Sequence, residues 1–478
     1  MTTLDAPRAP EVDVAAPRPR RVPVWLAIVA ASLPMFMATL DNLVMTSALP
    51  VIQLDLGSSV SELSWFMNAY TLAFATFMLP AATLGDRLGR RRVMLAGITV
   101  FTLASIASAL STTSEALIAA RAVQGVGAAA IMPLSLTLLA AAVPPAMRAA
   151  AIGIWGGVSG LGVALGPVIG GAVVEGVSWE AIFWLNVPVA LVAVPLLIVA
   201  VPESRGAWQR LDPVGTLLLG GAVFLGIWGI VHGNDDGWSD PRVLGPLVLS
   251  AVLVPAYVLW ARRREYAVLP LRLFRSRSFS VSNVIALFFT LGMFGTVFLL
   301  SQYLQIVQGY SPLDAGLRTL PWTAAPMVVA PIAGLLAPRV GLRPLLFVGL
   351  VLQTVSLVWF AVLTESAAGY PSFVVPLLMA GVGMGLTFAP MATGVLEGLP
   401  EDDFAMASSA NSTIREFGVA LGIALLVAVF LANGGALSPT GYDGAVGPAI
   451  LTGAAAVAVA AVAALFAPGR GRSHAPRA

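Results

Sequence analysis

Residues 160–171 read GLGVALGPVIGG, which places five glycines and one proline in twelve positions. In a water-soluble helix each interior glycine costs about 0.5–1 kcal/mol relative to alanine, and an interior proline costs about 3 kcal/mol. A bilayer changes this balance, because small residues let helix backbones approach closely and neighbouring helices satisfy the backbone groups that proline frees. Gly162, Gly166 and Gly170 are four residues apart and form one row on a helix. The stretch therefore predicts a membrane helix that packs tightly against a neighbouring helix.

The composition supports a membrane environment. Of the 478 residues, 58% are hydrophobic and 10% are charged, whereas an ordinary soluble domain has about 25% charged residues. Cysteine is absent, and the two histidines, His232 and His474, fall outside the interiors of the apolar segments. The absence of cysteine excludes disulfides, thiolate metal sites and cysteine nucleophiles. The sequence also has no nucleotide-binding loop and no catalytic cluster, so we expect neither an enzyme nor a metal or cofactor.

Fourteen apolar segments come close to the length of about 20 residues that crosses a bilayer as a helix. They are 24–46, 62–81, 93–110, 116–138, 151–174, 182–201, 212–231, 244–261, 281–302, 318–337, 343–364, 373–394, 404–431 and 447–467. Almost all arginines fall in the even-numbered loops and the terminal segments, with Arg242 and Arg318 as exceptions. Basic residues favour the cytoplasmic side, so both termini are predicted to be cytoplasmic. Topology explains the arginines, and the net charge of +2 gives no indication of nucleic-acid binding.

Short motifs recur in the same order along the chain. GVALG occupies 162–166 and again 418–422, and DRLGRR at 86–91 has a degraded copy, PRVGLR, at 338–343. The spacing crosses an even number of spans, which predicts two six-helix halves in parallel orientation with two inserted helices between them. The predicted organisation is a cytoplasmic N-terminal tail (1–22), an N-terminal half (23–201), a linker with the inserted spans (202–265), a C-terminal half (266–467) and a cytoplasmic C-terminal tail (468–478).

Four charged residues fall in the interiors of the predicted spans, namely Asp41, Arg121, Arg415 and Glu416. Placing Asp or Arg near the middle of a span costs about 2.5–3.5 kcal/mol, so such residues usually have a function and a partner nearby. At about 1.5 Å per residue, Asp41 and Arg121 both lie roughly 20–25 Å from the cytoplasmic surface. We therefore expect Asp41 to bind and release a proton, with an affinity that depends on Arg121, on substrate and on water access. The alternative is a permanent ion pair that only holds the first and fourth spans together.

Arg415 and Glu416 are adjacent in sequence and point in different directions on a helix, so we do not expect them to pair with each other. For each of them, facing the cavity and bracing a neighbouring span are both open. Other polar side chains in the spans are candidates for lining the cavity, with interfacial positions as the alternative. They are Asn42, Gln124, Gln302, Tyr303 and Asn411.

The loop ATLGDRLGRRRVMLAG, residues 82–97, combines an acid with four arginines. Topology anchoring alone would explain the arginines. The spacing of Asp86, Gly89 and Arg90 is more specific than anchoring requires, because it permits a turn at the glycine and a carboxylate near the helix ends. The loop is therefore a candidate for a specific contact.

Five motifs resemble the major facilitator superfamily, in particular its fourteen-span drug:proton antiporters of the EmrB/QacA type. They are LDNLVMTSALP (40–50), GDRLGRRR (85–92), LIAARAVQGVGAAAIMP (117–133), GLGVALGPVIGG (160–171) and WEAIFWLNVP (179–188). The resemblance covers nearly the whole chain. It implies an all-α membrane protein with the major facilitator fold.

The resemblance also implies roles at the matched positions. Asp41 would bind the proton, and Arg121 would be its coupling partner. Asp86, Gly89 and Arg90 would belong to a cytoplasmic latch that steadies one conformation. The antiporter motif of the fifth span would shape a helix interface, a candidate seam between two moving halves, through Gly162, Gly166, Pro167, Gly170 and Gly171.

We therefore expect a proton-coupled efflux transporter in a bacterial plasma membrane, which exports small hydrophobic or amphipathic compounds such as antibiotics by alternating access. The alternatives are a dedicated exporter of one endogenous metabolite or antibiotic and a proton symporter for uptake, against which the fifth-span motif argues. The span 318–337 has no carboxylate, which disfavours doubly charged substrates. The expected partners are the substrate, protons and the lipid bilayer, and we expect the protein to act as a monomer.

Overall fold

The computed structural model of the chain describes residues 23–144, 147–206, 210–264, 266–366, 368–400 and 403–468. Within these ranges every regular element is a helix. The elements are α1 (Val24–Leu56), α2 (Val60–Leu88), α3 (Arg90–Ala109), α4 (Ser114–Ala142), α5 (Arg148–Gly176), α6 (Ala181–Trp184), α7 (Asn186–Ala200), α8 (Pro213–Asp236), α9 (Pro241–Ala261), the short η2 (Leu271–Arg275), α10 (Arg277–Ile306), α11 (Pro312–Val340), α12 (Leu342–Glu365), α13 (Pro371–Leu396), α14 (Phe404–Ala432), α15 (Pro439–Tyr442) and α16 (Val446–Ala464). If α6 and α7 count as one span and the short α15 is left aside, these helices form the fourteen predicted spans.

Thirteen of the helical segments in the described ranges are long and apolar enough to cross a bilayer. The fourteenth span is α2, whose buried side carries the polar residues Ser64, Asn68 and Thr71. Some helices run past their predicted limits. α1 continues beyond residue 46 to Leu56 and ends where Gly57 turns the chain with a φ of 66°. The hydropathy pattern marks only the lipid-buried part of a helix, so it missed these outer turns.

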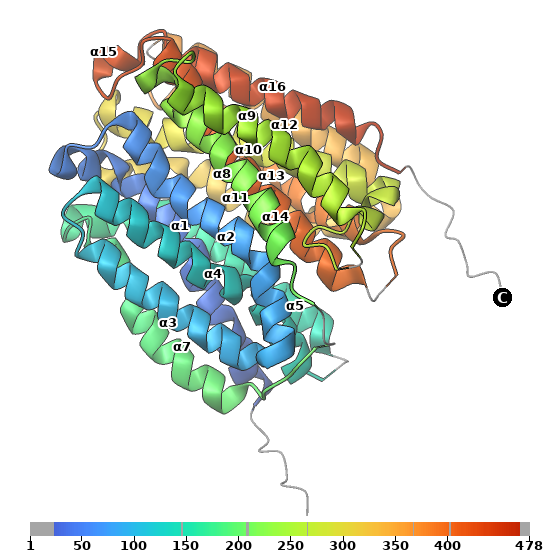
Figure 1. Cartoon of the computed structure of the whole chain (residues 1–478). Coiled ribbons are helices and arrows are strands. Elements are labelled where there is room, and N and C mark those ends of the chain that lie inside the picture. The colour runs from blue at the N-terminus through green and yellow to red at the C-terminus, as the bar shows by residue number, and fades with distance from the viewer. Residues whose placement is uncertain are drawn as a thin grey trace, which may run out of the picture.

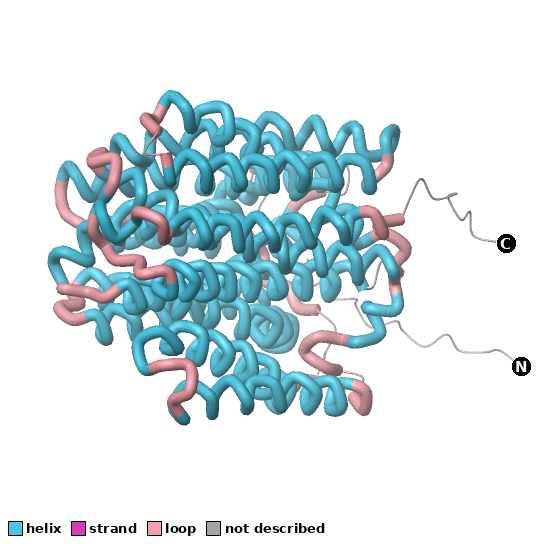
Figure 2. The backbone as a smooth tube through the Cα atoms, turned by 90° about the horizontal axis from the view of Figure 1, so that it is seen from above, coloured by secondary structure: helices cyan, strands magenta, loops and turns pink. Residues whose placement is uncertain are grey.

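The helices lie side by side in two groups (Figure 1). The first half contains α1–α7 and the second half contains α10–α14 and α16, with most helix contacts inside each group. α8 packs against α9 and also against α2 and α14, so the inserted helices cover one side of the line between the halves. Seen from above, most loops gather at the two ends of the bundle (Figure 2). We call the end where α2 meets α3, with Arg87–Arg92, the arginine end, and the opposite end the far end.

The internal repeat has a structural counterpart at the arginine end. Gly89 separates α2 from α3, and Gly341 separates α11 from α12, with φ angles of 117° and 95°. Glycine adopts such positive φ angles without the steric cost of a side chain. The two copies of the loop motif therefore make corresponding turns. The tail 1–22 lies outside the described residues, and the predicted domain boundaries stay predictions.

The glycine row of the opening motif packs within one half. On α5, Gly162, Gly166 and Gly170 face α1, and a Cβ on Gly166 would lie 2.5 Å from the Leu43 Cβ. On α14, the corresponding Gly422 faces the backbone of α10. In both halves the glycines thus allow the fifth helix to approach the first. This differs from the expectation that the row itself forms a seam between the halves, because helix geometry fixes which residues share a face but not which neighbour that face meets.

An adjacent face of the same motif does reach the second half. Gly171 lies against the backbone of Pro312 and Leu313 at the start of α11, and Gly316 lies against the Pro167 carbonyl. A side chain at either glycine would collide with main-chain atoms. The contact between the halves at the far end therefore depends on the Pro167 and Gly171 side of α5.

Further contacts join the halves toward the far end. The Ser301 hydroxyl on α10 donates to the Thr46 carbonyl on α1 at 3.1 Å, and the Leu313 amide donates to the Glu175 carboxylate at 3.3 Å. Toward the arginine end a pocket of about 420 Å³ opens between α2, the segments that flank α8 and α9, and the start of α14. The halves thus meet at the far end, whereas the pocket at the arginine end is lined by α2 of the first half, by the segments beside α8 and α9 and by Met406 of α14.

Candidate functional site

Asp41 lies in the interior of α1 and is the acceptor at the centre of a buried polar network. Its carboxylate accepts hydrogen bonds from the Arg121 guanidinium at 2.6 Å, from the Gln124 amide at 2.9 Å and from the Asn186 amide at 2.7 Å. The exposed fraction of Asp41 is 5% and that of Arg121 is 0%. An ionised carboxylate surrounded by three donors, one of them charged, fits this arrangement.

Arg121 is held in place from several sides. Its Nε donates to the Phe66 carbonyl at 3.1 Å, and its Nη1 also donates to the Gln124 side-chain oxygen at 2.7 Å. The guanidinium lies over the Tyr70 ring, 4.3 Å from the ring centre. Nη2 has no hydrogen-bond partner among the described residues. Removal of the Asp41 charge would therefore leave a buried cation with only neutral partners, which is costly in a low-dielectric interior.

The structure confirms that Asp41 and Arg121 meet, and it places Gln124 in the same network. Sequence reasoning missed Asn186 at the start of α7 and Ser105 on α3. The Asn186 amide bridges the Asp41 carboxylate and the Ser105 hydroxyl, at 2.7 and 2.9 Å. Asn186 stands in the recognised motif WEAIFWLNVP, and an amide within such an apolar stretch was the available signal.

We expect the substitution Asn186→Leu to lower the thermal stability of the protein. A hydrogen bond to a charged group contributes about 1.5–3 kcal/mol, so the melting temperature in detergent should fall. If Asp41 binds the transported proton, as the family resemblance implies, the pH dependence of transport should shift as well, because Asp41 loses a donor. The matched control is Asn411→Leu, which removes an amide pair with Asn283 in the second half. It should lower the thermal stability and leave the pH dependence of transport unchanged. If Asn186→Leu also leaves this pH dependence unchanged, a role of Asn186 at Asp41 is contradicted.

The remaining cavity candidates do not join the network. Asn42 is half-buried, and Gln302 is buried on α10, where its amide donates to the Phe298 carbonyl of its own helix. Tyr303 is buried in an aromatic cluster beside Phe373. None of these three side chains lines the pocket at the arginine end or the small pocket between α1, α5, α10, α11 and α13.

Arg415 and Glu416 lie on α14 and do not form an ion pair with each other in the described part of the chain. The Arg415 guanidinium lies 5.6 Å from the centre of the Phe388 ring on α13. The helix that carries both residues also packs against α2 of the first half. The Arg415 guanidinium thus faces α13 of its own half.

The arginine-end loop contains two separate carboxylate contacts. Asp86 pairs with Arg90 one helical turn later, at 2.7 Å. A second acid, Glu203 after α7, accepts hydrogen bonds from the backbone amides of Arg91 and Arg92 at 3.0 and 3.2 Å. These amides begin α3, and a helix N-terminus favours a negative charge. Asp86 thus lies near the helix ends as expected, and Glu203 adds a second carboxylate at the N-terminus of α3, from a segment that sequence reasoning did not connect with the loop.

We expect Glu203→Gln to lower the free energy of unfolding by about 0.3–1 kcal/mol, the usual contribution of an acid at a helix N-terminus. Thermal unfolding in detergent measures the change. The control is Arg92→Gln, because the Arg92 side chain is 70% exposed and its nitrogen lies 3.9 Å from the Glu203 carboxylate. This variant should have little effect. An equal loss in both variants would show that the side-chain ion pair, and not the helix terminus, stabilises the loop.

Two pockets lie between the halves. Besides the pocket at the arginine end, a space of about 40 Å³ separates α1 and α5 from α10, α11 and α13. Its lining is largely apolar, with Leu43, Val163 and Met293 among its residues, and includes the hydroxyls of Thr46 and Ser301. This inner pocket is too small for a drug-sized molecule, so a substrate could bind there only after the halves separate.

The family model of the Major Facilitator Superfamily matches residues 31–423. The chain is 33% identical over 417 residues to the tetracenomycin C resistance and export protein of Streptomyces glaucescens, which covers 87% of this chain and 77% of that protein. It is 34% identical to the multidrug resistance protein Stp of Mycobacterium tuberculosis (85% and 76% covered) and 32% identical to the methylenomycin A resistance protein of Streptomyces coelicolor (89% and 90% covered).

Solved structures share the fold at low sequence identity. The D-xylose-proton symporter aligns with a TM-score of 0.68 at 15% identity, covering 94% of this chain and 98% of that chain. A peptide transporter of the POT family in complex with sulfate aligns with a TM-score of 0.65 at 18% identity, covering 93% and 96%. These likenesses concern the arrangement of the helices alone.

Proposed function

This chain belongs to the major facilitator superfamily, and we propose that it exports drugs across a bacterial plasma membrane in exchange for protons. The observation that carries the proposal is the fully buried Asp41–Arg121 pair, whose charge is expensive to keep in the membrane interior. The relatives named for drug or antibiotic resistance support export.

We propose that Asp41 alternates between an ionised and a protonated form during transport. Ionised, it binds Arg121, Gln124 and Asn186. A proton on the carboxylate would remove the charge that Arg121 neutralises and so weaken the contact of α1 with α4. Because α1 also carries the contacts to α5 and to Ser301 of the second half, protonation at Asp41 can bias how the halves meet.

The proton gradient supplies enough free energy for export. One charge that moves down about 100 mV releases about 2.3 kcal/mol, and a tenfold concentration ratio corresponds to about 1.4 kcal/mol. One proton per cycle therefore supports a gradient of about 50-fold for a neutral drug. In the proposed cycle Asp41 takes up a proton on the outside after substrate has left, and releases it inside before substrate binds.

The proposed orientation places the arginine end in the cytoplasm. Arg87–Arg92, Arg262–Arg264 and Arg272 belong to loops at this end, and basic loops favour the cytoplasmic side. With this orientation the halves meet near the outer surface, at Gly171 and Gly316, and the pocket that includes Met406 lies at the cytoplasmic end. Substrate would then enter from the cytoplasm or the inner leaflet.

The inner pocket indicates the chemistry of the substrate. An apolar lining with a few hydroxyls favours hydrophobic or amphipathic compounds with few charges. A second candidate is a dedicated exporter of one antibiotic made by the same cell. Two relatives named for single antibiotics, tetracenomycin C and methylenomycin A, favour it.

The two candidates and an uptake function can be separated in one experiment. An efflux-deficient bacterial host that expresses this chain is grown across a panel of unrelated drugs, with and without a protonophore. Resistance to several compounds that the protonophore abolishes is the expected result. Resistance to one compound alone indicates the dedicated exporter. Higher sensitivity, or accumulation of drug that depends on the gradient, would contradict export and indicate uptake.

A further inference from the structure

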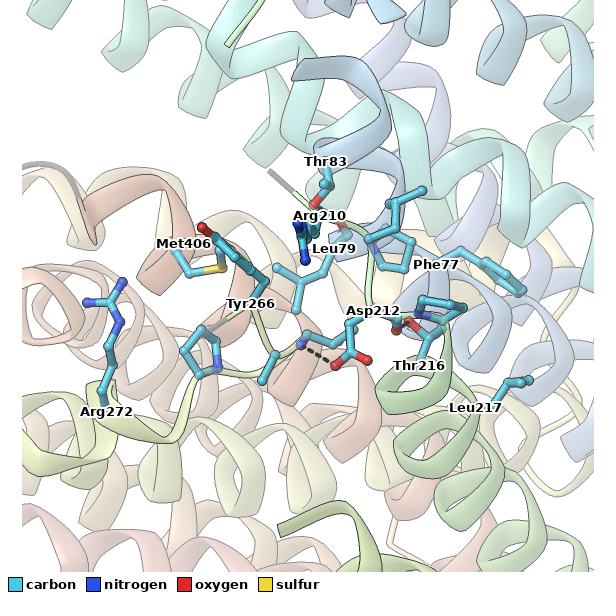
Figure 3. Close-up of a pocket in the computed structure, with 16 residues that line it drawn as sticks. Phe77, Leu79, Thr83, Arg210, Asp212, Thr216, Leu217, Tyr266, Arg272 and Met406 are labelled. Atoms are coloured by element: carbon cyan, nitrogen blue, oxygen red, sulfur yellow. Dashed lines mark hydrogen bonds between the residues drawn. The ribbon is translucent and has the colours of Figure 1, made fainter. Parts of the chain in front are cut away.

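The pocket at the arginine end is larger than the inner pocket and is lined by charged as well as apolar side chains. It has a volume of about 420 Å³ and lies between α2, the segment before α8, the segment after α9 and the start of α14 (Figure 3). Figure 3 shows Arg210 close to Thr83 and Tyr266, with Phe77 and Leu217 to one side. The pocket therefore has a polar part and an apolar part.

One cation that lines the pocket, Arg210, has no salt-bridge partner among the described residues. Arg272 is neutralised by Asp403, to which it donates two hydrogen bonds. The Asp212 carboxylate also lines the pocket and forms no salt bridge with Arg210; its Oδ1 accepts hydrogen bonds from the Gly215 amide and the Trp260 indole at 2.8 and 2.9 Å, and its Oδ2 accepts one from the Val268 amide at 3.2 Å. Arg210 forms no ion pair within the described part of the chain. An anion in the pocket would supply the missing partner.

The polar part lies at the level of the membrane surface. Trp260, at the end of α9, donates to Asp212 at the start of α8, and the Arg264 guanidinium lies 4.3 Å from the centre of the Trp260 ring. Tryptophan and tyrosine with neighbouring arginines are typical of the headgroup region. Tyr266, which is 48% exposed, lines the pocket at this level.

The apolar part extends into the lipid. Leu217 is four positions inside α8, about 6 Å along its axis, and Phe77 is eleven positions before the end of α2, about 16 Å along that helix. Their exposed fractions are 74% and 42%, so both side chains are open to the surroundings of the protein. The pocket therefore offers a cation at headgroup level and apolar contacts at the depth of acyl chains.

We propose that this pocket binds an anionic phospholipid from the leaflet at the arginine end, with the phosphate at Arg210 and an acyl chain along Phe77 and Leu217. The lipid lies between α2 of the first half and Met406 of α14 in the second half. This site is separate from the Asp41 network and does not depend on what the protein exports.

Photo-crosslinking tests the site directly. The full-length protein is reconstituted with a phosphatidylglycerol that carries a diazirine on one acyl chain, and labelled peptides are mapped by mass spectrometry. Labelling is expected on the peptides that contain Phe77 and Leu217. Because one arginine near the surface contributes about 1 kcal/mol to the binding of anionic lipid, Arg210→Gln should lower this labelling about fivefold. Leu217→Ser should lower it as well, since the acyl chain loses a contact.

Two variants outside the pocket serve as matched controls for this site. Arg263→Gln removes an arginine at the end of α9 that does not line the pocket, and Val248→Ser changes an exposed apolar residue on α9. Both should retain labelling. If a phosphatidylcholine analogue labels these peptides as strongly as the phosphatidylglycerol does, or if Arg263→Gln lowers labelling as much as Arg210→Gln does, the lipid binds the basic surface unspecifically and the proposed site is contradicted. Full competition by millimolar glycerol phosphate would show that the ligand is a free phosphate ester and not a lipid.

Discussion

Asp41→Asn is expected to abolish drug export while the protein still folds and inserts into the membrane. An asparagine has nearly the same shape and can accept hydrogen bonds from Gln124 and Asn186, so the packing of α1 is preserved. It can neither bind a proton nor neutralise Arg121, which has no exposed surface. Resistance of an efflux-deficient host should fall to the level of cells that lack the protein. Quantitative blotting and melting temperature in detergent report whether the variant is present and folded.

Asp55→Asn is the matched control for this prediction. Asp55 is an acid on the same helix and accepts one hydrogen bond, from the Trp179 indole at 2.8 Å. The substitution removes the same charge near the far end, away from Arg121, and should leave most of the resistance intact. If Asp41→Asn keeps proton-coupled export at the level of the native protein, the Asp41–Arg121 contact is only a structural ion pair between α1 and α4.

The second large effect is expected at the far-end contact between the halves. Gly171→Leu places a side chain against the backbone of Pro312 and Leu313, where no side-chain rotation can relieve the collision. Overpacking usually costs about 1–3 kcal/mol, which shifts the equilibrium between conformations by about 5- to 150-fold. The conformation that is closed at the far end should therefore be disfavoured and export lost, while membrane insertion is unchanged. Gly316→Leu should behave in the same way, because Gly316 lies against the Pro167 carbonyl.

The control on the same helix is Gly157→Leu, since a Cβ at Gly157 meets no atom within 4 Å. The closure itself can be measured, because the sequence contains no cysteine. Glu175→Cys and Leu313→Cys, introduced together, should form a disulfide across the far end. Addition of Gly171→Leu should reduce its yield. Full export with Gly171→Leu, or an undiminished disulfide, would contradict the role of this face as the seam.

The sequence of the glycine motif predicts a tightly packed helix but not which neighbour each of its faces contacts. Residue type and spacing were enough to predict a tightly packed membrane helix with a small-residue row. The row packs on α1 within its own half, whereas the neighbouring positions Pro167 and Gly171 meet α11. Both faces carry small residues, so the sequence does not distinguish the neighbour inside the half from the neighbour across the seam. That distinction depends on the three-dimensional packing of helices far apart in the chain.

The ionisable residues were predictable for a different reason. A charge inside a membrane helix is rare and needs a partner, and the estimated depths of Asp41 and Arg121 matched, so their contact followed from the sequence. Amides carry no comparable penalty, so the sequence does not distinguish Asn186, which binds Asp41, from Gln302 or Asn411, which bond within the second half. Glu203 was missed because its role is to meet the first amides of α3, which come from a distant part of the chain.

The exchange of protons for drug at Asp41 is tested most directly with purified protein in liposomes that contain a trapped pH indicator. A drug to which the protein gives resistance is added on the side of the arginine end, and proton movement is followed with the native protein and with Asp41→Asn. We predict drug-dependent proton movement in the opposite direction to the drug for the native protein and none for Asp41→Asn. Drug transport by the native protein without proton movement, or unchanged proton movement with Asp41→Asn, would contradict this account.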